Sequence, residues 1–124
     1  MGKTILVVDD DHGVQQLIQM ALEDEGYTVH VADDGNVALQ TLAAQTKAAT
    51  PPDLIVLDYM MPRMDGATFV HESEQQGLRD SIPIILLTAA GQVKQLAASL
   101  NAEKYLSKPF DMDVLIDTIA QCFA

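Results

Sequence analysis

The chain has 124 residues, of which 18 are Asp or Glu and seven are Lys or Arg, so its formal net charge at pH 7 is −11. Nucleic acids and anionic membranes bind through basic faces, so this charge excludes both as expected partners. The length predicts one domain, residues 1–124, with a core that is stable without metal or disulfide staples, and the hydrophobic content of 48% argues against disorder. The lone cysteine, Cys122, and the lack of a signal peptide or membrane-spanning run predict a cytoplasmic protein.

The predicted elements begin with an apolar strand, Ile5–Val8, followed by a helix whose apolar residues have the spacing of one buried face. These residues are Val14, Leu17, Ile18, Ala21 and Leu22. We expect this helix to end at Gly26, a residue type favoured just after a helix. The second strand, around Val29–Val31, alternates apolar and polar residues, which is typical of an edge strand with one wet face.

A second helix is predicted from Val37, Ala38 and Leu42, and the loose stretch Ala43–Pro52 contains the Thr-Pro-Pro run that must end it. The third strand, Leu54–Leu57, is continuously apolar, as a central parallel strand should be. A third helix contains Phe69 and Val70 and is predicted to start near Asp65 as its N-cap.

The apolar run Ile82–Leu87 contains the fourth strand, and a weakly patterned helix is expected within Gln92–Leu100. Lys104–Ser107 is short and mixed, which predicts the second edge strand. The last helix carries an apolar stripe made of Met112, Leu115, Ile116, Ile119 and Phe123. Five strand–helix repeats predict an α/β fold with a doubly wound parallel sheet in the order 2-1-3-4-5.

Polar residues stand at the carboxyl ends of four predicted strands, where open parallel sheets bind ligands. The first strand ends in Asp9-Asp10-Asp11, the third in Asp58, the fourth in Thr88 and the fifth in Lys108-Pro109. Each alone has a structural explanation, since Asp at a strand–helix junction usually caps the helix and Lys in a loop is usually solvated. Their convergence on one rim predicts a functional site.

The chemistry of this rim indicates phosphoryl transfer. Asp9, Asp10 and Asp58 would bring together three negative charges that repel one another unless a cation is present. Oxygen ligands without Cys or His select a hard cation such as Mg²⁺, and its charge together with that of Lys108 balances the three carboxylates. A carboxylate beside Mg²⁺ and Lys is suited to receive a phosphoryl group.

Four runs carry a resemblance to a known family: Ile5–Asp11, Leu57–Gly66, Leu87–Ala89 and Tyr105–Phe110. In combination they closely resemble the receiver domain of two-component response regulators, including the single-domain chemotaxis regulators. The resemblance covers essentially the whole chain. It implies the flavodoxin-like receiver fold of five strand–helix repeats, with Mg²⁺ as the cofactor.

The resemblance also implies a role for each acidic residue of the site. Asp58 is expected to be the phosphoacceptor. Asp10 is expected to bind Mg²⁺ directly and Asp9 mainly through water, and Asp58 and the main-chain carbonyl of Met60 complete the protein ligands.

The same resemblance implies the phosphate-binding and switch residues. Lys108 is expected to pair with the phosphoryl group, and its bond to Pro109 to be cis. Thr88, beside Ala89, is the expected switch hydroxyl that moves towards the phosphate. Tyr105 is the aromatic residue expected to turn inward behind it.

The implied partners are proteins. A sensor histidine kinase or a histidine phosphotransfer protein would donate the phosphoryl group, and the surface of the fourth helix, fifth strand and fifth helix would signal to a downstream target. The chain is expected to be a monomer or a weak phosphorylation-dependent dimer. It would be a switch with self-catalysed phosphorylation and dephosphorylation at Asp58, not an enzyme.

Three alternatives compete with this reading. A Mg²⁺-dependent small-molecule phosphohydrolase usually has a second acid two residues after its nucleophile, where this chain has Met60. A flavin mononucleotide carrier cradles phosphate in a Gly/Ser/Thr-rich loop after the first strand, where three aspartates would repel it. A degenerate receiver would bind partners without phosphorylation, yet every expected pocket residue is present.

Overall fold

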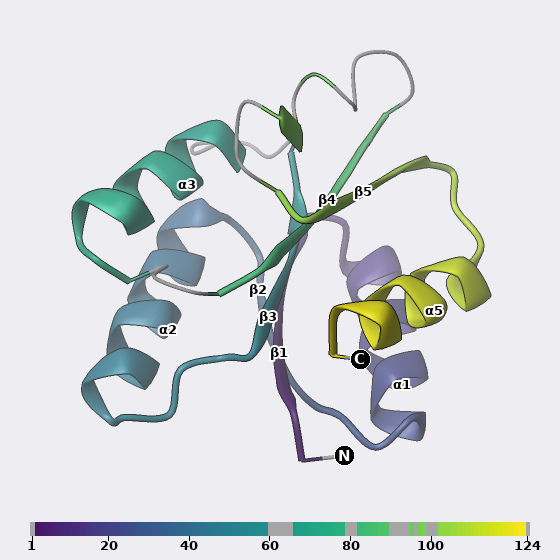
Figure 1. Cartoon of the computed structure of the whole chain (residues 1–124), viewed down its shortest axis with the longest axis horizontal. Coiled ribbons are helices and arrows are strands. Elements are labelled where there is room, and N and C mark those ends of the chain that lie inside the picture. Colours follow the sequence, from purple (N-terminus) through teal and green to yellow (C-terminus); the bar gives the residue numbers. More distant parts are fainter. Residues whose placement is uncertain are drawn as a thin grey trace.

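The computed structural model describes residues 2–59, 66–78, 82–89, 95, 97–98 and 102–123. Within these residues, strands and helices alternate from β1 to β4, and β5 and α5 follow (Figure 1). Their bounds are β1 Thr4–Val8, α1 His12–Asp24, β2 Thr28–Ala32, α2 Gly35–Lys47, β3 Leu54–Asp58, α3 Gly66–Gln75, β4 Ile84–Ala89, β5 Lys104–Lys108 and α5 Met112–Phe123. The helix predicted within Gln92–Leu100 lies mostly outside the described residues; Gln95, Ala97 and Ala98 are helical.

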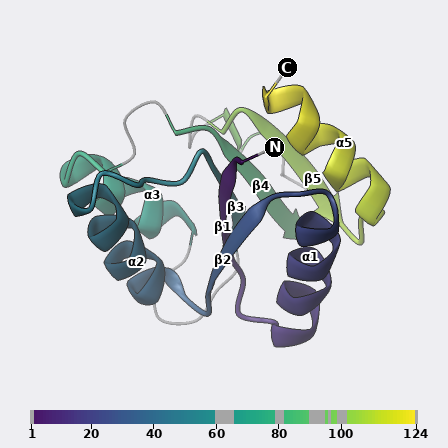
Figure 2. The same cartoon turned by 90° about the horizontal axis from the view of Figure 1, so that it is seen from below.

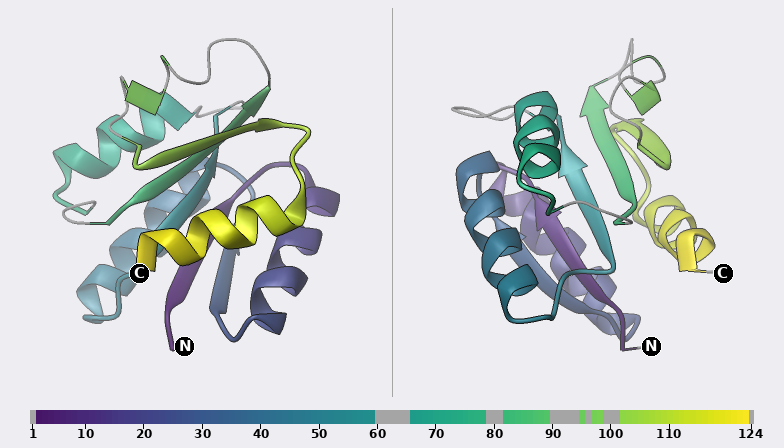
Figure 3. Two further views of the ribbon diagram at one scale, coloured as in Figure 1. Left: turned by 45° about the vertical axis from the view of Figure 1, so that its right-hand side comes forward. Right: turned by 60° about the vertical axis from the view of Figure 1, so that its left-hand side comes forward.

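All five strands pair in parallel, in the order β2-β1-β3-β4-β5. Helices α1 and α5 cover one face of the sheet, and α2 and α3 cover the other (Figures 1 and 2). The views in Figure 3 show the same three layers, with the sheet between the two pairs of helices. The doubly wound fold and its predicted strand order are therefore confirmed.

Each face of the sheet has its own apolar cluster because successive side chains of a strand point to opposite sides. On β1, Ile5 and Val7 pack with α1 and α5, while Leu6 and Val8 pack with α2 and α3. The central strand β3 is buried along its whole length, whereas β2 alternates and β5 is largely exposed. The predicted division into central and edge strands is thus confirmed.

Helix α1 departs from its predicted buried face. Its buried residues are Gln15, Ile18 and Leu22, whereas Leu17 is 62% exposed. The apolar stripe was therefore placed correctly at Ile18 and Leu22 but wrongly at Leu17, because the line of contact with the sheet passes through Gln15 instead. The predicted end of the helix is confirmed: Glu25 is the C-cap, and Gly26 follows with a φ of +95°.

Helix α2 also differs from the prediction at its surface and at its end. Val37 is exposed, and the buried residues are Gly35, Ala38 and Leu42. The helix continues to Lys47, so the first half of the stretch predicted as loose, Ala43–Pro52, is helical. Ala48 is the C-cap, and the chain leaves the helix at Ala49, whose φ is +61°, before it reaches the two prolines.

Aspartates begin two of the helices at the carboxyl edge of the sheet. The Asp11 side chain accepts hydrogen bonds from the backbone N–H groups of Gly13 and Val14, and Asp34 accepts one from Val37. Such caps satisfy donors that the first turn of a helix leaves unpaired. The predicted cap of α3, Asp65, lies outside the described residues. In the described part of the chain, no helix combines the length and apolar character needed to cross a bilayer.

Candidate functional site

Three predicted acidic residues meet at the carboxyl edge of the two central strands β1 and β3. Asp9 follows β1 and Asp58 is the last residue of β3, and both side chains are buried, while Asp10 is exposed. One carboxylate oxygen from each residue lies within 4.8 Å of the other two. Asp9 and Asp58 are 49 residues apart in the sequence, and the parallel pairing of β1 with β3 brings them together.

Local hydrogen bonds fix the turn that carries Asp9. Its backbone N–H donates to the carbonyl of Ala32 at 3.1 Å, which continues the pairing of β1 with β2. Its carboxylate Oδ1 accepts from the backbone N–H of Asp11 at 2.9 Å. The Asp9 carboxylate is therefore buried in a fixed orientation, and the Asp11 carboxylate next to it is committed to capping α1.

Lys108, the last residue of β5, reaches across the edge of the sheet to the acidic residues. Its Nζ lies 3.5 Å from Asp9 Oδ2 and 3.3 Å from Asp58 Oδ2, with the lysine side chain 28% exposed. One cation is thus shared by two buried carboxylates, which offsets part of the cost of burying them. The peptide bond from Lys108 to Pro109 is cis, the isomer that the family resemblance implies.

The other predicted site residues lie on the two strands beyond β3. Thr88 is buried on β4, one position after Leu87, which is the register partner of Asp58. Ala89 ends β4 opposite Lys108. Tyr105 is on the edge strand β5 and is 42% exposed, so its ring is at the surface in this structure. Met60, the predicted carbonyl ligand, lies outside the described residues.

The donor set suits a hard divalent cation. The acidic cluster formed by Asp9, Asp10 and Asp58 offers only carboxylate oxygens, which Mg²⁺ prefers over nitrogen or sulfur. The nearby His12 is directed elsewhere, with its Nε2 3.3 Å from Asp33 Oδ1. With Lys108 as the adjacent cation, the site combines a metal-binding edge with a positive charge for an anionic group.

Sequence reasoning missed one residue that supports the site. Gln15 of α1 is buried, and its Nε2 donates to the main-chain carbonyl of Asp9 at 3.2 Å. A signal for it exists, because Gln15, Ile18 and Leu22 follow the spacing of one helix face. A helix face defined by apolar residues alone does not include this glutamine.

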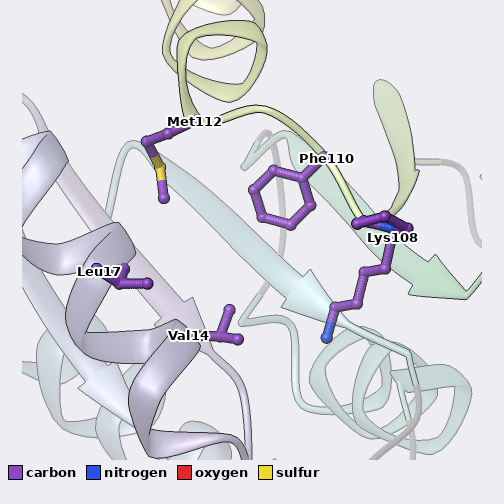
Figure 4. Close-up of a pocket in the computed structure, with 6 residues that line it drawn as sticks. Val14, Leu17, Lys108, Phe110 and Met112 are labelled. Carbon is purple, nitrogen blue, oxygen red and sulfur yellow. The ribbon is translucent and has the colours of Figure 1, made fainter.

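An apolar groove borders the site between α1 and the segment that joins β5 to α5 (Figure 4). Its volume is about 410 Å³. It is lined by Val14, Leu17, Lys108, Pro109, Phe110 and Met112. Figure 4 shows the apolar side chains of both elements turned towards the groove, with the Lys108 side chain running alongside it. The exposure of Leu17 is explained by this position, since it forms a wall of the groove rather than part of the core.

Comparison with known sequences identifies the family. The family model described as response regulator receiver domain matches residues 5–120. The response regulators MprA of Mycobacterium ulcerans and of Mycolicibacterium vanbaalenii are 41% and 40% identical over 118 residues. Each match covers 94% of this chain but 48% of the relative, so the chain spans about half the length of these curated relatives.

Solved structures share the fold along nearly the full chain. A putative response regulator from Chloroflexus aurantiacus has a TM-score of 0.85 at 31% identity, with 98% of both chains covered. The chemotaxis protein CheY4 of Vibrio cholerae has a TM-score of 0.83 at 33% identity, covering 98% of this chain and 99% of that one. The response regulator TrrA of Thermotoga maritima, solved in complex with Mg²⁺-BeF, has a TM-score of 0.79 at 31% identity, covering 97% and 98%.

The family match and the shared fold extend over the same residues as the sheet, the acidic cluster and Lys108. The chain therefore belongs to the response regulator receiver domains of two-component systems.

Proposed function

We propose that this receiver domain is a phosphorylation-controlled switch whose phosphoacceptor is Asp58. The donor would be the phosphohistidine of a sensor histidine kinase or of a histidine phosphotransfer protein. The observation that carries the proposal is the position of Asp58, whose carboxylate lies beside Asp9 and Asp10 and 3.3 Å from the Lys108 ammonium group.

The chemistry would be a direct phosphoryl transfer. A carboxylate oxygen of Asp58 forms a bond to phosphorus while the phosphorus–nitrogen bond of the donor breaks, and the electron pair stays on the leaving imidazole nitrogen. Lys108 is already within reach of the acceptor carboxylate and would pair with the transferred group. Asp9, Asp10, Asp58 and the carbonyl of Met60 would hold Mg²⁺, which supplies positive charge for the phosphoryl oxygens.

The response to phosphorylation would pass through β4 and β5. Thr88 is buried one residue beyond the register partner of Asp58, so its hydroxyl group is on the strand next to the acceptor. Movement of this hydroxyl group towards the phosphate would leave space for Tyr105, which starts from an exposed position on the next strand. Inward rotation of Tyr105 would change the surface of β5 and α5 that a downstream protein reads.

We further propose that the phosphodonor protein covers the apolar groove. Lys108 lines the groove and also contacts Asp58, so a donor that brings a phosphohistidine to Asp58 along this rim would lie against the groove. The groove would then take an apolar side of the donor, with Leu17 on one wall and Phe110 on the other. Burial of this apolar surface would supply binding energy beside the reacting groups.

The decisive experiment is labelling with acetyl phosphate and Mg²⁺. We expect Asp58→Asn to abolish labelling, because the amide cannot act as the nucleophile. Asp53→Asn is the matched control, because Asp53 directly precedes the first residue of β3, at the other end of the strand from Asp58. Its carboxylate accepts a hydrogen bond from the backbone N–H of Thr4, which an amide oxygen can also accept. Continued labelling of Asp58→Asn, measured by intact mass, would show that another residue is the acceptor.

A further inference from the structure

Gln15 is a buried polar residue of α1 that contacts the ends of two strands. Its side chain is buried, with 6% exposure, and its amide Nε2 lies near three oxygen acceptors. These are the main-chain carbonyls of Asp9 at 3.2 Å and Ala32 at 3.3 Å, and Asp33 Oδ1 at 3.1 Å. Because an amide nitrogen carries two hydrogens, one of them is shared between two acceptors.

These acceptors belong to the ends of two adjacent strands. Asp9 follows β1, and Ala32 and Asp33 close β2, so one amide joins both strand ends to α1. The backbone bond from Asp9 to Ala32 and the bond from Asp11 to the Asp9 carboxylate hold the same turn from other directions. Without the Gln15 amide, the main-chain carbonyl of Asp9 would lose its hydrogen bond to α1.

We propose that Gln15 is a positioning residue for the cation site, acting through the main chain of Asp9. The inference rests on the proposed binding of Mg²⁺ by Asp9, Asp10 and Asp58. These carboxylates repel one another, so their spacing must be imposed by the backbone that carries them. Gln15 imposes it on the β1 side by holding Asp9, and with it Asp10, against the end of β2. Groups that orient metal ligands in this way contribute to metal affinity although they never touch the metal.

The test compares Mg²⁺ binding by isothermal titration calorimetry in Gln15→Met and in the unmodified chain. Methionine keeps the length and apolar stem of glutamine but has no donor hydrogen. We expect the Kd for Mg²⁺ to rise about three- to tenfold, the effect of losing one ordinary hydrogen bond that orients the site. Gln16→Met is the matched control, because Gln16 is the neighbouring residue of the same helix and is exposed, so its Kd should be unchanged.

A second control separates positioning from general stability. Ile119→Val thins the core of the layer formed by α1 and α5, far along the chain from the acidic turn. It should lower the urea midpoint while keeping the Kd for Mg²⁺.

Labelling by acetyl phosphate gives a second readout of the Gln15 role. Gln15→Met should raise the Mg²⁺ concentration that gives the half-maximal labelling rate. At saturating Mg²⁺ its labelling rate should stay within about twofold of that of the unmodified chain.

Three results would overturn the inference, and they differ in whether the proposed function fails with it. If the unmodified chain binds Mg²⁺ and Gln15→Met binds it equally well, the positioning role of Gln15 is wrong and the proposed function stands. If the unmodified chain binds no Mg²⁺ in the calorimeter, both proposals fail together. A loss of affinity in Ile119→Val as large as in Gln15→Met would also overturn it, because the effect would then follow stability rather than position.

Discussion

Lys108 is the residue on which the charge balance of the site depends. Its ammonium group lies 3.5 Å from a buried Asp9 oxygen and 3.3 Å from a buried Asp58 oxygen. Without a phosphoryl group it offsets repulsion between these acids, and with one on Asp58 it would have a stronger anionic partner. The same side chain can thus stabilise the resting site and report its modification.

Replacement of Lys108 by alanine tests this double role. We expect Lys108→Ala to bind Mg²⁺ no more weakly than the unmodified chain, because a positive charge that competes for the same carboxylates is removed. We also expect that acetyl phosphate no longer changes the environment of Tyr105 in this variant. The NMR resonance of the Tyr105 backbone amide measures this change. Lys104→Ala is the control, since Lys104 is exposed at the other end of β5. A normal Tyr105 response in Lys108→Ala would refute the coupling.

At the scale of elements, the acidic triplet after β1 divides into three tasks. Asp9 is buried in the acidic cluster, Asp10 is exposed at its rim and Asp11 caps α1. A strand that leads straight into a capped helix keeps this turn short, so the acidic residues stay at the edge of the sheet. The cap therefore contributes to the site as well as to the helix.

The cap is expected to carry measurable stability. Asp11→Ala should lower the free energy of unfolding by about 1 kcal/mol, because two backbone donors of the first helical turn lose their acceptor. Urea denaturation measures this change. Asp24→Ala, at the last residue of the same helix, should be neutral or slightly stabilising, since a negative charge at a helix C-terminus is unfavourable. Equal losses in both variants would argue against a capping role.

At the scale of the whole molecule, a net charge of −11 is concentrated in part at one edge of the sheet, where three carboxylates meet. A ligand that binds only the folded state stabilises it by mass action. If Mg²⁺ binds at the acidic cluster, the stability of the entire domain becomes linked to the Mg²⁺ concentration.

This linkage predicts a concentration-dependent gain in stability. At free Mg²⁺ about 100 times its Kd, the free energy of unfolding should rise by about 2.7 kcal/mol, and EDTA should reverse the rise. Urea denaturation at constant ionic strength separates this effect from general screening by salt. Asp10→Asn should reduce the gain, because one carboxylate of the cluster is lost. The same gain from NaCl alone would speak against a specific site.

The proposed recognition of a phosphodonor protein also belongs to the whole molecule, because the groove lies between α1 and the segment from β5 to α5. The experiment uses a histidine kinase that phosphorylates the unmodified chain. With this donor, Leu17→Ala should lower the rate of phosphotransfer about fivefold, since apolar contact is lost beside the site. Labelling by acetyl phosphate should be unchanged, because a small donor does not cover the groove. Val37→Ala on the opposite layer is the control. Equal slowing with both donors would exclude docking as the cause.

The strand order and the meeting of the three acidic residues could both be predicted from the amino-acid sequence. Continuous apolar runs such as Leu54–Leu57 distinguish central strands from the edges. In a parallel sheet, residues at the carboxyl ends of neighbouring strands meet whatever their separation along the chain. For this reason Asp9, Asp10 and Asp58 could be assigned to one site from their positions alone, and the structure brings them together.

The centre of the buried face of α1 and the contacts of its polar side chains could not be predicted in this way. Helical spacing defines a stripe, but its exact centre depends on the elements packed against it, so Leu17 was predicted to be buried and instead lines a groove. The contacts of Gln15 with Ala32 and Asp33 likewise join residues far apart in the chain. Periodicity is a property of one element, whereas burial and ion pairing depend on distances between elements, and those distances exist only in the folded chain.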